Sequence, residues 1–231
     1  MKNCIVIIPA MNEAKAIGKV LDALPKQKIH FVLVVDNGST DGTAEVAEKH
    51  GARIVKEQRP GYGQACLAGI AYVEALPQNE HPEIIAFVDG DFSDDPSELP
   101  LLLEPIEKGE AEMVVGSRVL GNCQPGSLTP AQVFGNWLST RLLRWLYGVT
   151  YTDLGPFRAI RLQALRKLNM QDTNYGWTVE MQIKAAKLGI KSCEIPVTYR
   201  KRIGKSKISG TIKGTILAGT KILWKIYTCR S

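Results

Sequence analysis

The chain has 231 residues and a formal net charge of +6, from 29 Lys and Arg against 23 Asp and Glu. The positive charge lies near the C-terminus, because residues 195–231 hold nine of the basic residues and no acidic one. The remainder is slightly acidic, which argues against a protein that coats nucleic acid. A near-neutral body with a cationic tail favours binding to phosphate groups, on a ligand or at a membrane surface.

The five cysteines are scattered along the chain and form no C-x-x-C pair. This pattern disfavours a disulfide framework or a zinc site and favours a reducing compartment. Met1-Lys2-Asn3 leads directly into an apolar strand, so we expect no signal peptide. No apolar run approaches the roughly 20 residues that span a bilayer. We therefore expect a cytoplasmic protein, with peripheral contact at the cytoplasmic membrane face as one option.

The first half of the sequence alternates short apolar runs with amphipathic segments. The predicted strands are Cys4–Pro9, Ile29–Val35, Arg53–Val55, Ile84–Val88 and Met113–Val115. The first predicted helix ends near Leu24, and the second, capped by Ser39 or Thr40, ends at His50. The third ends near Leu76, and the fourth runs from Pro96 to Glu107. Such alternation predicts βαβ units and therefore an α/β fold, with a single Rossmann-like, mostly parallel sheet flanked by helices.

The second half is less regular. After a loop over 119–130, we predict a helix at Ala131–Tyr147, irregular backbone and a strand over 151–160, a helix at Tyr175–Leu188, a strand at Ile190–Tyr199, a basic loop to Gly210 and an amphipathic helix over 211–228. Phe134, Trp137 and Trp145 recur at helical spacing, so this helix faces either the core or a lipid surface. No domain boundary is evident, and we expect one domain over 1–231.

Polar turns follow three of the predicted strands, as Asn12-Glu13, Asp36-Asn37 and Asp89-Gly90-Asp91. In parallel sheets, ligands bind outside the carboxyl ends of the strands, so these turns are expected at one edge. Residues i and i+2 of a strand point the same way, so Asp89 and Asp91 converge on one point. Two carboxylates this close are tolerable when a cation lies between them, and the alternative is a solvated Asp-Gly turn.

Four motifs within residues 4–120 resemble the nucleotide-binding half of family 2 glycosyltransferases, which have the GT-A fold. They are Ile8-Pro9-Ala10-Met11-Asn12-Glu13, Val35-Asp36-Asn37-Gly38-Ser39-Thr40-Asp41, Asp89-Gly90-Asp91 and Gly116-Ser117-Arg118. Gly155-Pro156-Phe157-Arg158-Ala159, Glu180-Met181 and Lys205-Ser206-Lys207 are similar, more narrowly, to dolichyl- and polyprenyl-phosphate sugar synthases. The chain departs from the pattern at Asn37, where many relatives carry Asp, and we expect none of the C-terminal transmembrane helices that some relatives append.

The resemblance implies a nucleotide-sugar-binding half over 1–118, an acceptor half with a basic lid over 119–210, and an amphipathic C-terminal helix over 211–231. It also implies roles for single residues. The base and ribose are expected beside Pro9, Asn12, Glu13 and Asp36, and the diphosphate near Arg59 and Gly61, where glycine permits close backbone approach. Gly90 leaves similar room. Asn37 leaves the base, uracil or guanine, open.

In the family the acidic pair holds a metal ion, so Asp89 and Asp91 are expected to bind Mg²⁺ or Mn²⁺ and thereby the donor diphosphate. Arg118 and Arg158 are expected to present guanidinium groups near the acceptor. The basic loop, through Arg202, Lys205 and Lys207, is expected to close over the diphosphate and exclude water.

The acceptor determines whether a base is needed. A lipid phosphate is already an anionic nucleophile near neutral pH, whereas a hydroxyl needs a carboxylate base, for which Glu180 is the first candidate and Asp153 the second. We expect a metal-dependent, inverting glycosyltransferase that moves a sugar from UDP or GDP to a polyprenyl or other lipid phosphate. The alternatives are a hydroxyl-directed glycosyltransferase, a sugar-phosphate nucleotidyltransferase, and an inert domain tethered by its basic tail.

Overall fold

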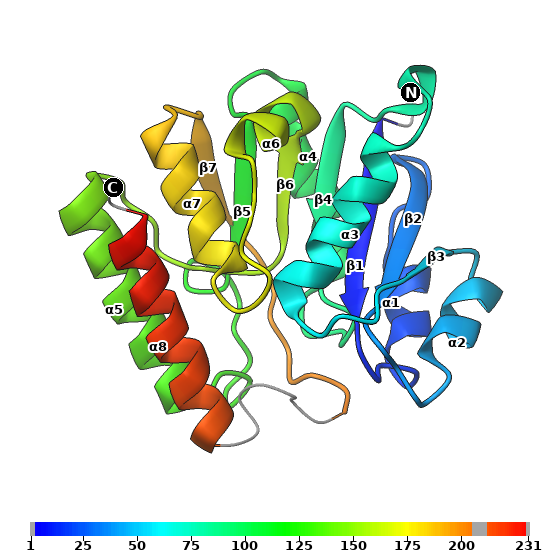
Figure 1. The fold of residues 1–231 in the computed structure, drawn as a ribbon, viewed down its shortest axis with the longest axis horizontal. Helices are drawn as coiled ribbons and strands as arrows, with labels where there is room; N and C mark the ends of the chain where they lie inside the picture. Colours follow the sequence, from blue (N-terminus) through cyan, green and yellow to red (C-terminus); the bar gives the residue numbers. More distant parts are fainter. Residues whose placement is uncertain (1–2, 205–211, 230–231) are drawn as a thin grey trace.

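The computed structural model describes residues 3–204 and 212–229, the side chains of 212–218 excepted. Its centre is one seven-stranded sheet in the order β3-β2-β1-β4-β6-β5-β7 (Figure 1). The strands are β1 (Cys4–Ala10), β2 (Ile29–Asp36), β3 (Arg53–Lys56), β4 (Ile84–Phe87), β5 (Met113–Ser117), β6 (Arg158–Arg161) and β7 (Ser192–Pro196). All neighbouring pairs are parallel except those of β6, which runs antiparallel to β4 and β5. The predicted α/β class with a mostly parallel sheet is confirmed.

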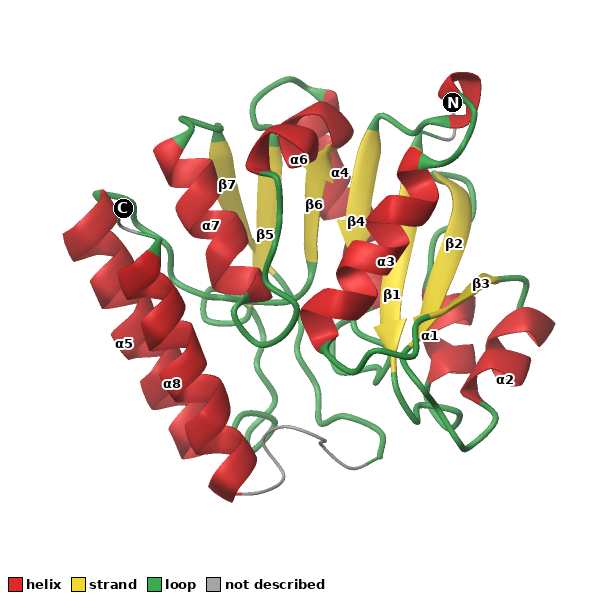
Figure 2. Cartoon of the chain, in the orientation of Figure 1, coloured by secondary structure: helices red, strands yellow, loops and turns green. Residues whose placement is uncertain are grey.

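Helices cover both faces of this sheet, as Figure 2 shows. The helices are α1 (Ile17–Ala23), α2 (Thr43–Lys49), α3 (Tyr62–Glu74), α4 (Leu99–Glu107), α5 (Pro130–Tyr147), α6 (Leu162–Leu168), α7 (Trp177–Lys187) and α8 (Ile212–Thr228), with short 3-10 turns η1 (Gln78–Glu80) and η2 (Pro96–Glu98). The strands alternate their apolar side chains between two cores. Ile5, Ile7 and Phe87 pack on the side of α3 and α7, whereas Val6 and Ile8 pack on the side of α1 and α4.

The structure differs from the sequence prediction at three places. The helix after β2 begins at Thr43, and neither Ser39 nor Thr40 caps it, because Gly42 is the capping residue and the Ser39 hydroxyl accepts from the Asn12 amide instead. The segment from Pro96 begins with the 3-10 turn η2 before α4. Helix α6 was not predicted at all, since it is short and follows β6 without a loop or a side-chain cap.

The last helix, α8, lies beside α5 at the end of the sheet that carries β7 (Figure 1). The Tyr147 hydroxyl at the end of α5 donates to the Ile226 carbonyl of α8. On the other side, Lys225 of α8 forms an ion pair with Glu180 of α7. In the described part of the chain, no helix combines the length and the apolar character that crossing a bilayer requires.

Candidate active site

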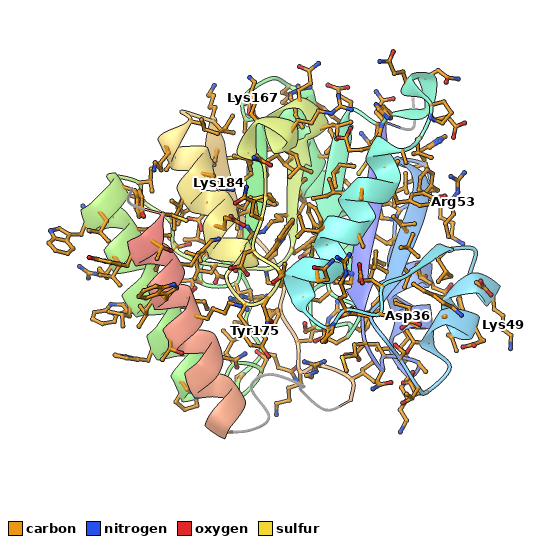
Figure 3. All side chains as sticks on the ribbon, viewed as in Figure 1. Asp36, Lys49, Arg53, Lys167, Tyr175 and Lys184 are labelled. Atoms are coloured by element: carbon orange, nitrogen blue, oxygen red, sulfur yellow. The ribbon has the colours of Figure 1, made fainter. Side chains whose placement is uncertain are left out.

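The loops that follow β1, β2, β4, β5 and β7 meet at one edge of the sheet. This is the lower edge in Figure 1, and Figure 3 shows Asp36 there, with Tyr175 further along on the loop before α7. The edge is rich in buried acidic side chains, namely Glu13, Asp36, Asp91, Asp94 and Asp153. Burial of so many carboxylates is costly unless each has a partner. Their partners therefore distinguish structural acids from those available to a ligand.

The turns after β1 and β2 are joined by hydrogen bonds. The Asn12 amide donates to Ser39 Oγ (2.9 Å), Asn12 Oδ1 accepts from the Thr40 amide (2.8 Å), and the Glu13 amide donates to Thr43 Oγ1 (2.8 Å). Asn12 adopts a left-handed conformation (φ 54°), which Asn tolerates better than most residues. The motif around Pro9, Asn12 and Glu13 thus builds a rigid double turn, and its contact with a nucleotide stays a prediction.

Asp36 and Asn37, at the end of β2, have different surroundings. One oxygen of Asp36, Oδ1, accepts from the Ser39 amide at 2.9 Å. The amide group of Asn37 donates to the carbonyls of Glu57 (2.9 Å) and Arg59 (2.7 Å), and its oxygen accepts from the Gly61 amide (2.9 Å). An aspartate could not donate to two carbonyls. Asn37 therefore fastens the loop after β3, which explains in physical terms why Asn replaces Asp in this chain.

The loop after β3 carries Arg59, whose side chain is 75% exposed and pairs with the nearly buried Glu57 through two guanidinium contacts (3.0 and 2.8 Å). The hydrogen bonds from Arg59 lower the pKa of Glu57 to about 2. Gly61 has a φ of 144°, and a Cβ there would lie 2.2 Å from the Thr173 carbonyl oxygen. The space predicted for a ligand beside Gly61 is thus filled by protein backbone, and this glycine has a packing role.

Asp89 and Asp91 lie just beyond β4, as the strand period predicts. Asp89 Oδ1 accepts from the Tyr62 hydroxyl (3.0 Å), and Asp91 Oδ1 accepts from the Ser93 amide (2.9 Å). Burial and the nearby Asp91 charge raise the pKa of Asp89 to about 7. The nearby Arg202 and Arg118 act in the opposite direction, so the raised pKa shows that these cations do not fully compensate burial and repulsion. A Cβ added at Gly90 would lie 3.5 Å from side-chain atoms of Ala10 and Ile8, which is an ordinary contact, so Gly90 is not required there by packing. The close approach of a ligand to Gly90 stays a prediction.

The acidic pair fits a divalent cation of the Mg²⁺ or Mn²⁺ type, because carboxylate oxygens are the ligands that such ions prefer. In the described part of the chain, no group of three or more His, Cys, Asp or Glu side chains is arranged to hold a metal ion. Two carboxylates leave most of an octahedral shell to other ligands, as is usual for metal ions that bind together with a diphosphate. The site is therefore incomplete without a phosphate-bearing ligand.

The segment after β7 lies across this pair. Arg202 contacts Asp91 Oδ2 at 3.2 Å and Glu13 Oε1 at 2.7 Å, and the Ile203 amide donates to the Asp91 carbonyl at 2.9 Å. Arg202 of the predicted basic lid thus lies at this edge of the sheet, and closure of the loop over a diphosphate stays a prediction. Lys205 and Lys207 lie outside the described residues.

Arg118, after β5, forms a closed pair with Asp153. Its Nε and Nη2 lie 2.7 and 2.6 Å from the two carboxylate oxygens, and its backbone amide also donates to Asp153. Burial lowers the pKa of Arg118, but the bond with Asp153 outweighs it and the net pKa is raised, so the group stays charged. Both oxygens of Asp153 are in use and the side chain is 1% exposed. This pairing does not favour Asp153 as a catalytic base, and that role stays a prediction.

Arg158 is the first residue of strand β6 and is 0% exposed. Its guanidinium donates to the backbone carbonyls of Leu154, Gly155 and Thr178. Its guanidinium is thus engaged by the backbone, and its contact with an acceptor phosphate stays a prediction. Burial lowers the pKa of Arg158, while the nearby Tyr62 favours its charged form. The guanidinium thereby joins the loop at 154–155 to the start of α7.

Glu180, the first-choice base, is 1% exposed within α7. It accepts from the amides of Gln171 (3.1 Å) and Asp172 (2.7 Å) and pairs with Lys184 and Lys225, each at 3.0 Å. Burial raises its pKa, but the Asp172 amide and the two ammonium groups outweigh this, and the net pKa is lowered. A carboxylate so well stabilised is a weak base. Glu180 joins α7, α8 and the loop at 171–172, and these contacts do not favour a base at this position. Its role as a base stays a prediction.

Sequence reasoning missed three residues of this edge. Tyr62 holds Asp89, Glu57 holds Arg59, and Asp94 is a buried acid beside the pair. The run Asp91-Phe92-Ser93-Asp94-Asp95 gave a signal for Asp94, since several acids follow the same strand. Nothing in the sequence marks Tyr62, because the helix that carries it meets β4 only in the folded chain.

Comparison with known proteins agrees with this geometry. Residues 5–168 match the model of glycosyl transferase family 2. An uncharacterized glycosyltransferase of Mycobacterium tuberculosis is 37% identical over 224 residues, covering 96% of each chain. An undecaprenyl-phosphate mannosyltransferase of Micrococcus luteus is 30% identical over 225 residues, covering 91% of this chain and 89% of that protein.

A crystal structure of glucosyl-3-phosphoglycerate synthase from M. tuberculosis, in complex with Mn²⁺, UDP and glucosyl-3-phosphoglycerate, superposes with a TM-score of 0.77 at 22% identity. The match covers 99% of this chain and 80% of that one, and it confirms the expected GT-A fold. The sheet order, the extent of the family match and the identity to full-length relatives lead to one conclusion: this chain belongs to glycosyl transferase family 2 and is a glycosyltransferase.

Proposed function

We propose that this enzyme transfers a hexose from a nucleotide-sugar, UDP- or GDP-linked, to a polyprenyl phosphate, with inversion at the anomeric carbon. The observation that carries the proposal is the pair Asp89 and Asp91, whose mutual repulsion calls for a cation, at the edge where three loops can hold a nucleotide. The complex of glucosyl-3-phosphoglycerate synthase with Mn²⁺ and UDP supports the donor class. Family membership argues against a nucleotidyltransferase and against an inert tethered domain.

In this proposal Asp89 and Asp91 hold Mg²⁺ or Mn²⁺, and the ion, when bound, neutralises negative charge on the departing diphosphate. Tyr62 orients Asp89 by its hydrogen bond, and burial raises the pKa of Tyr62, so that its proton stays available for donation. The turns around Asn12 and Asp36 receive the nucleoside. Arg202, already next to Glu13 and Asp91, shifts toward the diphosphate and keeps water from the donor.

The acceptor follows from the two carboxylates that were predicted as bases. Both oxygens of Asp153 pair with Arg118, and Glu180 is occupied by two amides and two lysines. A phosphate needs no base: one of its oxygens bonds to the anomeric carbon while the bond from that carbon to the nucleoside diphosphate breaks. Because the oxygens of both carboxylates already have partners, the site favours a phosphate acceptor over a hydroxyl acceptor. The name of the M. luteus relative supports a lipid phosphate.

Helices α5 and α8 supply the surface on which a lipid could be reached. Trp137 (52%) and Trp145 (78%) of α5, with Trp224 (65%) of α8, are exposed, and α5 contains Arg141 and Arg144 but no acidic residue. Exposed aromatic rings with cations between them are typical of surfaces that contact a membrane. We infer that this pair of helices rests peripherally on an anionic bilayer.

The test is transfer from radiolabelled UDP- and GDP-hexoses, with Mn²⁺, to polyprenyl phosphate and to the matching polyprenol. The proposal predicts a lipid-linked product only with the phosphate. Transfer to polyprenol or to free sugar hydroxyls, with none to polyprenyl phosphate, would contradict it.

The surface is tested separately by sedimentation with anionic vesicles. Replacing Trp145 by Ala is expected to weaken binding several-fold, by roughly 1 kcal/mol. The control Leu101→Ala, which removes an exposed side chain (48%) from α4, should leave it unchanged. Equal binding of all three proteins would contradict the membrane surface.

A further inference from the structure

Asp94 is buried without a partner. The side chain is 1% exposed, and neither carboxylate oxygen has a hydrogen-bond partner among the described residues. Buried polar groups in folded proteins are almost always hydrogen-bonded, and an unsatisfied buried carboxyl group is destabilising. A ligand that brings hydrogen-bond donors would remove this cost. Among the described residues, the loop after β4 therefore contains two buried side chains without a hydrogen-bond partner, the Ser93 hydroxyl and the Asp94 carboxyl group, and only the second carries acidic oxygens.

The surroundings of Asp94 are polar and structured. Its backbone pairs with that of Tyr199 after β7, and the ring of Tyr199 lies under the Arg118 guanidinium, 5.0 Å from its centre. Burial and the charge of Asp89 raise the pKa of Asp94, while Arg118 acts in the opposite direction. In either protonation state the group can hydrogen-bond to hydroxyls: an ionised carboxylate accepts, and a protonated one also donates.

The strand order gives the position of Asp94 relative to the donor. Turns from β1 and β2 lie on one side of β4, whereas β6, β5 and β7 lie on the other. Asp94 adjoins Tyr199 and Arg118, which follow β7 and β5, so it lies beyond the acidic pair as seen from the nucleotide side. A donor that crosses the edge with its diphosphate at Asp89 and Asp91 therefore directs its sugar toward Asp94.

The chemistry of Asp94 suits hydroxyl groups better than other ligands. A second phosphate would meet the negative charges of Asp89, Asp91 and Asp94 together. In the part of the chain that is described, Asp94 does not complete a three-acid cluster suited to a metal ion. Sugar hydroxyls donate to a carboxylate and are neutral, so they satisfy the orphaned oxygens without adding charge.

We propose that Asp94, with Arg118 and Tyr199 around it, forms a subsite that binds hydroxyl groups of the donor sugar and determines which sugar is accepted. This inference rests on the proposed function as far as the donor is a nucleotide-sugar, and it does not depend on the acceptor. Asp94 is thus a specificity residue. Its carboxyl oxygens gain hydrogen bonds only from a sugar whose hydroxyl groups reach them.

The experiment compares binding of the nucleoside diphosphate and of the nucleotide-hexose, each with Mn²⁺ and without acceptor, by calorimetry. UDP and GDP series are both used. Asp94→Asn is expected to bind the diphosphate as the wild type does and to bind the nucleotide-hexose about 10-fold or more weakly, the effect of losing a charged hydrogen bond. Because the variant removes an unpartnered buried charge, its melting temperature should stay equal or rise. The neighbour variant Asp95→Asn, whose carboxylate pairs with Arg200, should keep the sugar preference.

Monodeoxy donors identify the contact independently of any variant. In the wild type, one or two of the 2-, 3-, 4- and 6-deoxy analogues should bind more weakly than the parent donor. In Asp94→Asn, the same analogues should bind as tightly as the parent donor. The proposal is overturned if no deoxy analogue differs for the wild type, if Asp94→Asn keeps its affinity for the nucleotide-hexose, or if it loses the diphosphate in equal measure. Failure of the wild type to bind any nucleotide-sugar would instead overturn the proposed function, and binding without transfer to lipid would overturn only the acceptor.

Discussion

Two buried acidic regions of this enzyme differ in how their charges are balanced. At the junction of α7 and α8, Glu180 receives two amides and two ammonium groups, and its net pKa is lowered. In the loop after β4, burial and the neighbouring Asp91 charge raise the pKa of Asp89 to about 7, and Asp94 has no hydrogen-bond partner among described residues. Burial alone therefore does not identify the reactive acids. A carboxylate whose partners are complete serves the fold, and one whose partners are missing is available to a ligand.

The largest expected effect comes from the loop after β4. Asp91→Asn should lower transfer by about 10²–10³-fold, because electrostatic stabilisation of the departing diphosphate depends on the ion that the pair holds. Stability should be unchanged or slightly higher, since repulsion with Asp89 is relieved. Steady-state turnover and thermal melting measure the two effects, and chelation of divalent ions by EDTA should reproduce the first. Turnover that persists with EDTA would contradict the metal site.

At the junction of α7 and α8, replacing a carboxylate by the corresponding amide should lower stability and leave turnover nearly unchanged. Glu180→Gln should lower the free energy of unfolding by about 2–3 kcal/mol, because Lys184 and Lys225 lose a buried counter-charge. Turnover per folded molecule with a phosphate acceptor should stay within a few-fold of wild type, because no proton is taken by Glu180. Urea melts and single-turnover assays separate these outcomes. A loss of turnover comparable to that of Asp91→Asn, in a protein that still melts like wild type, would restore Glu180 as a base.

Asn37 is a second residue whose hydrogen bonds are complete, and its replacement tests the loop after β3. Asn37→Asp should destabilise the loop after β3 by about 1–3 kcal/mol, since two carbonyls lose their donors and face a negative charge instead. Nucleotide binding should weaken with it. Asn79→Asp, on the exposed η1 turn, introduces the same charge where nothing depends on the amide. If both variants melt alike, Asn37 is not the clamp that its hydrogen bonds indicate.

The smallest expected effect is on the pH dependence of stability. The lowered pKa of Glu180 means that its contribution is present above the ordinary carboxyl range and is lost as pH falls through the folded-state pKa. Lys225, whose pKa is raised, contributes below its ordinary range and loses its effect as pH rises through the folded value. The stability gap between wild type and Glu180→Gln should thus be constant near neutrality and narrow in strong acid. A gap that widens on acidification would contradict this balance.

The sequence allowed us to predict which acidic residues lie at the edge of the sheet. It did not reveal which of them are paired with a cation. Strand period and turn chemistry are local, so they placed Asp89 and Asp91 together and Asp36 at the same edge, on the far side of β1. The state of Glu180 depends on Lys225, which reaches it only after α8 packs on α7. Arg158 is buried because β6 inserts antiparallel between β4 and β5, an arrangement that no local pattern reveals. Residue type was therefore a fair guide to position and a poor guide to role wherever the partner came from a distant segment.

The most direct test of the central claim is the affinity for Mn²⁺, measured by calorimetry with and without the nucleoside diphosphate. Two carboxylates, one of them in contact with Arg202, make an incomplete site, so the empty protein should bind Mn²⁺ weakly. With the diphosphate present, affinity should rise at least about 10-fold, and Asp91→Asn should abolish the rise. Tight binding by the empty protein, or an unchanged rise in Asp91→Asn, would contradict the assignment of this loop as the metal and donor site.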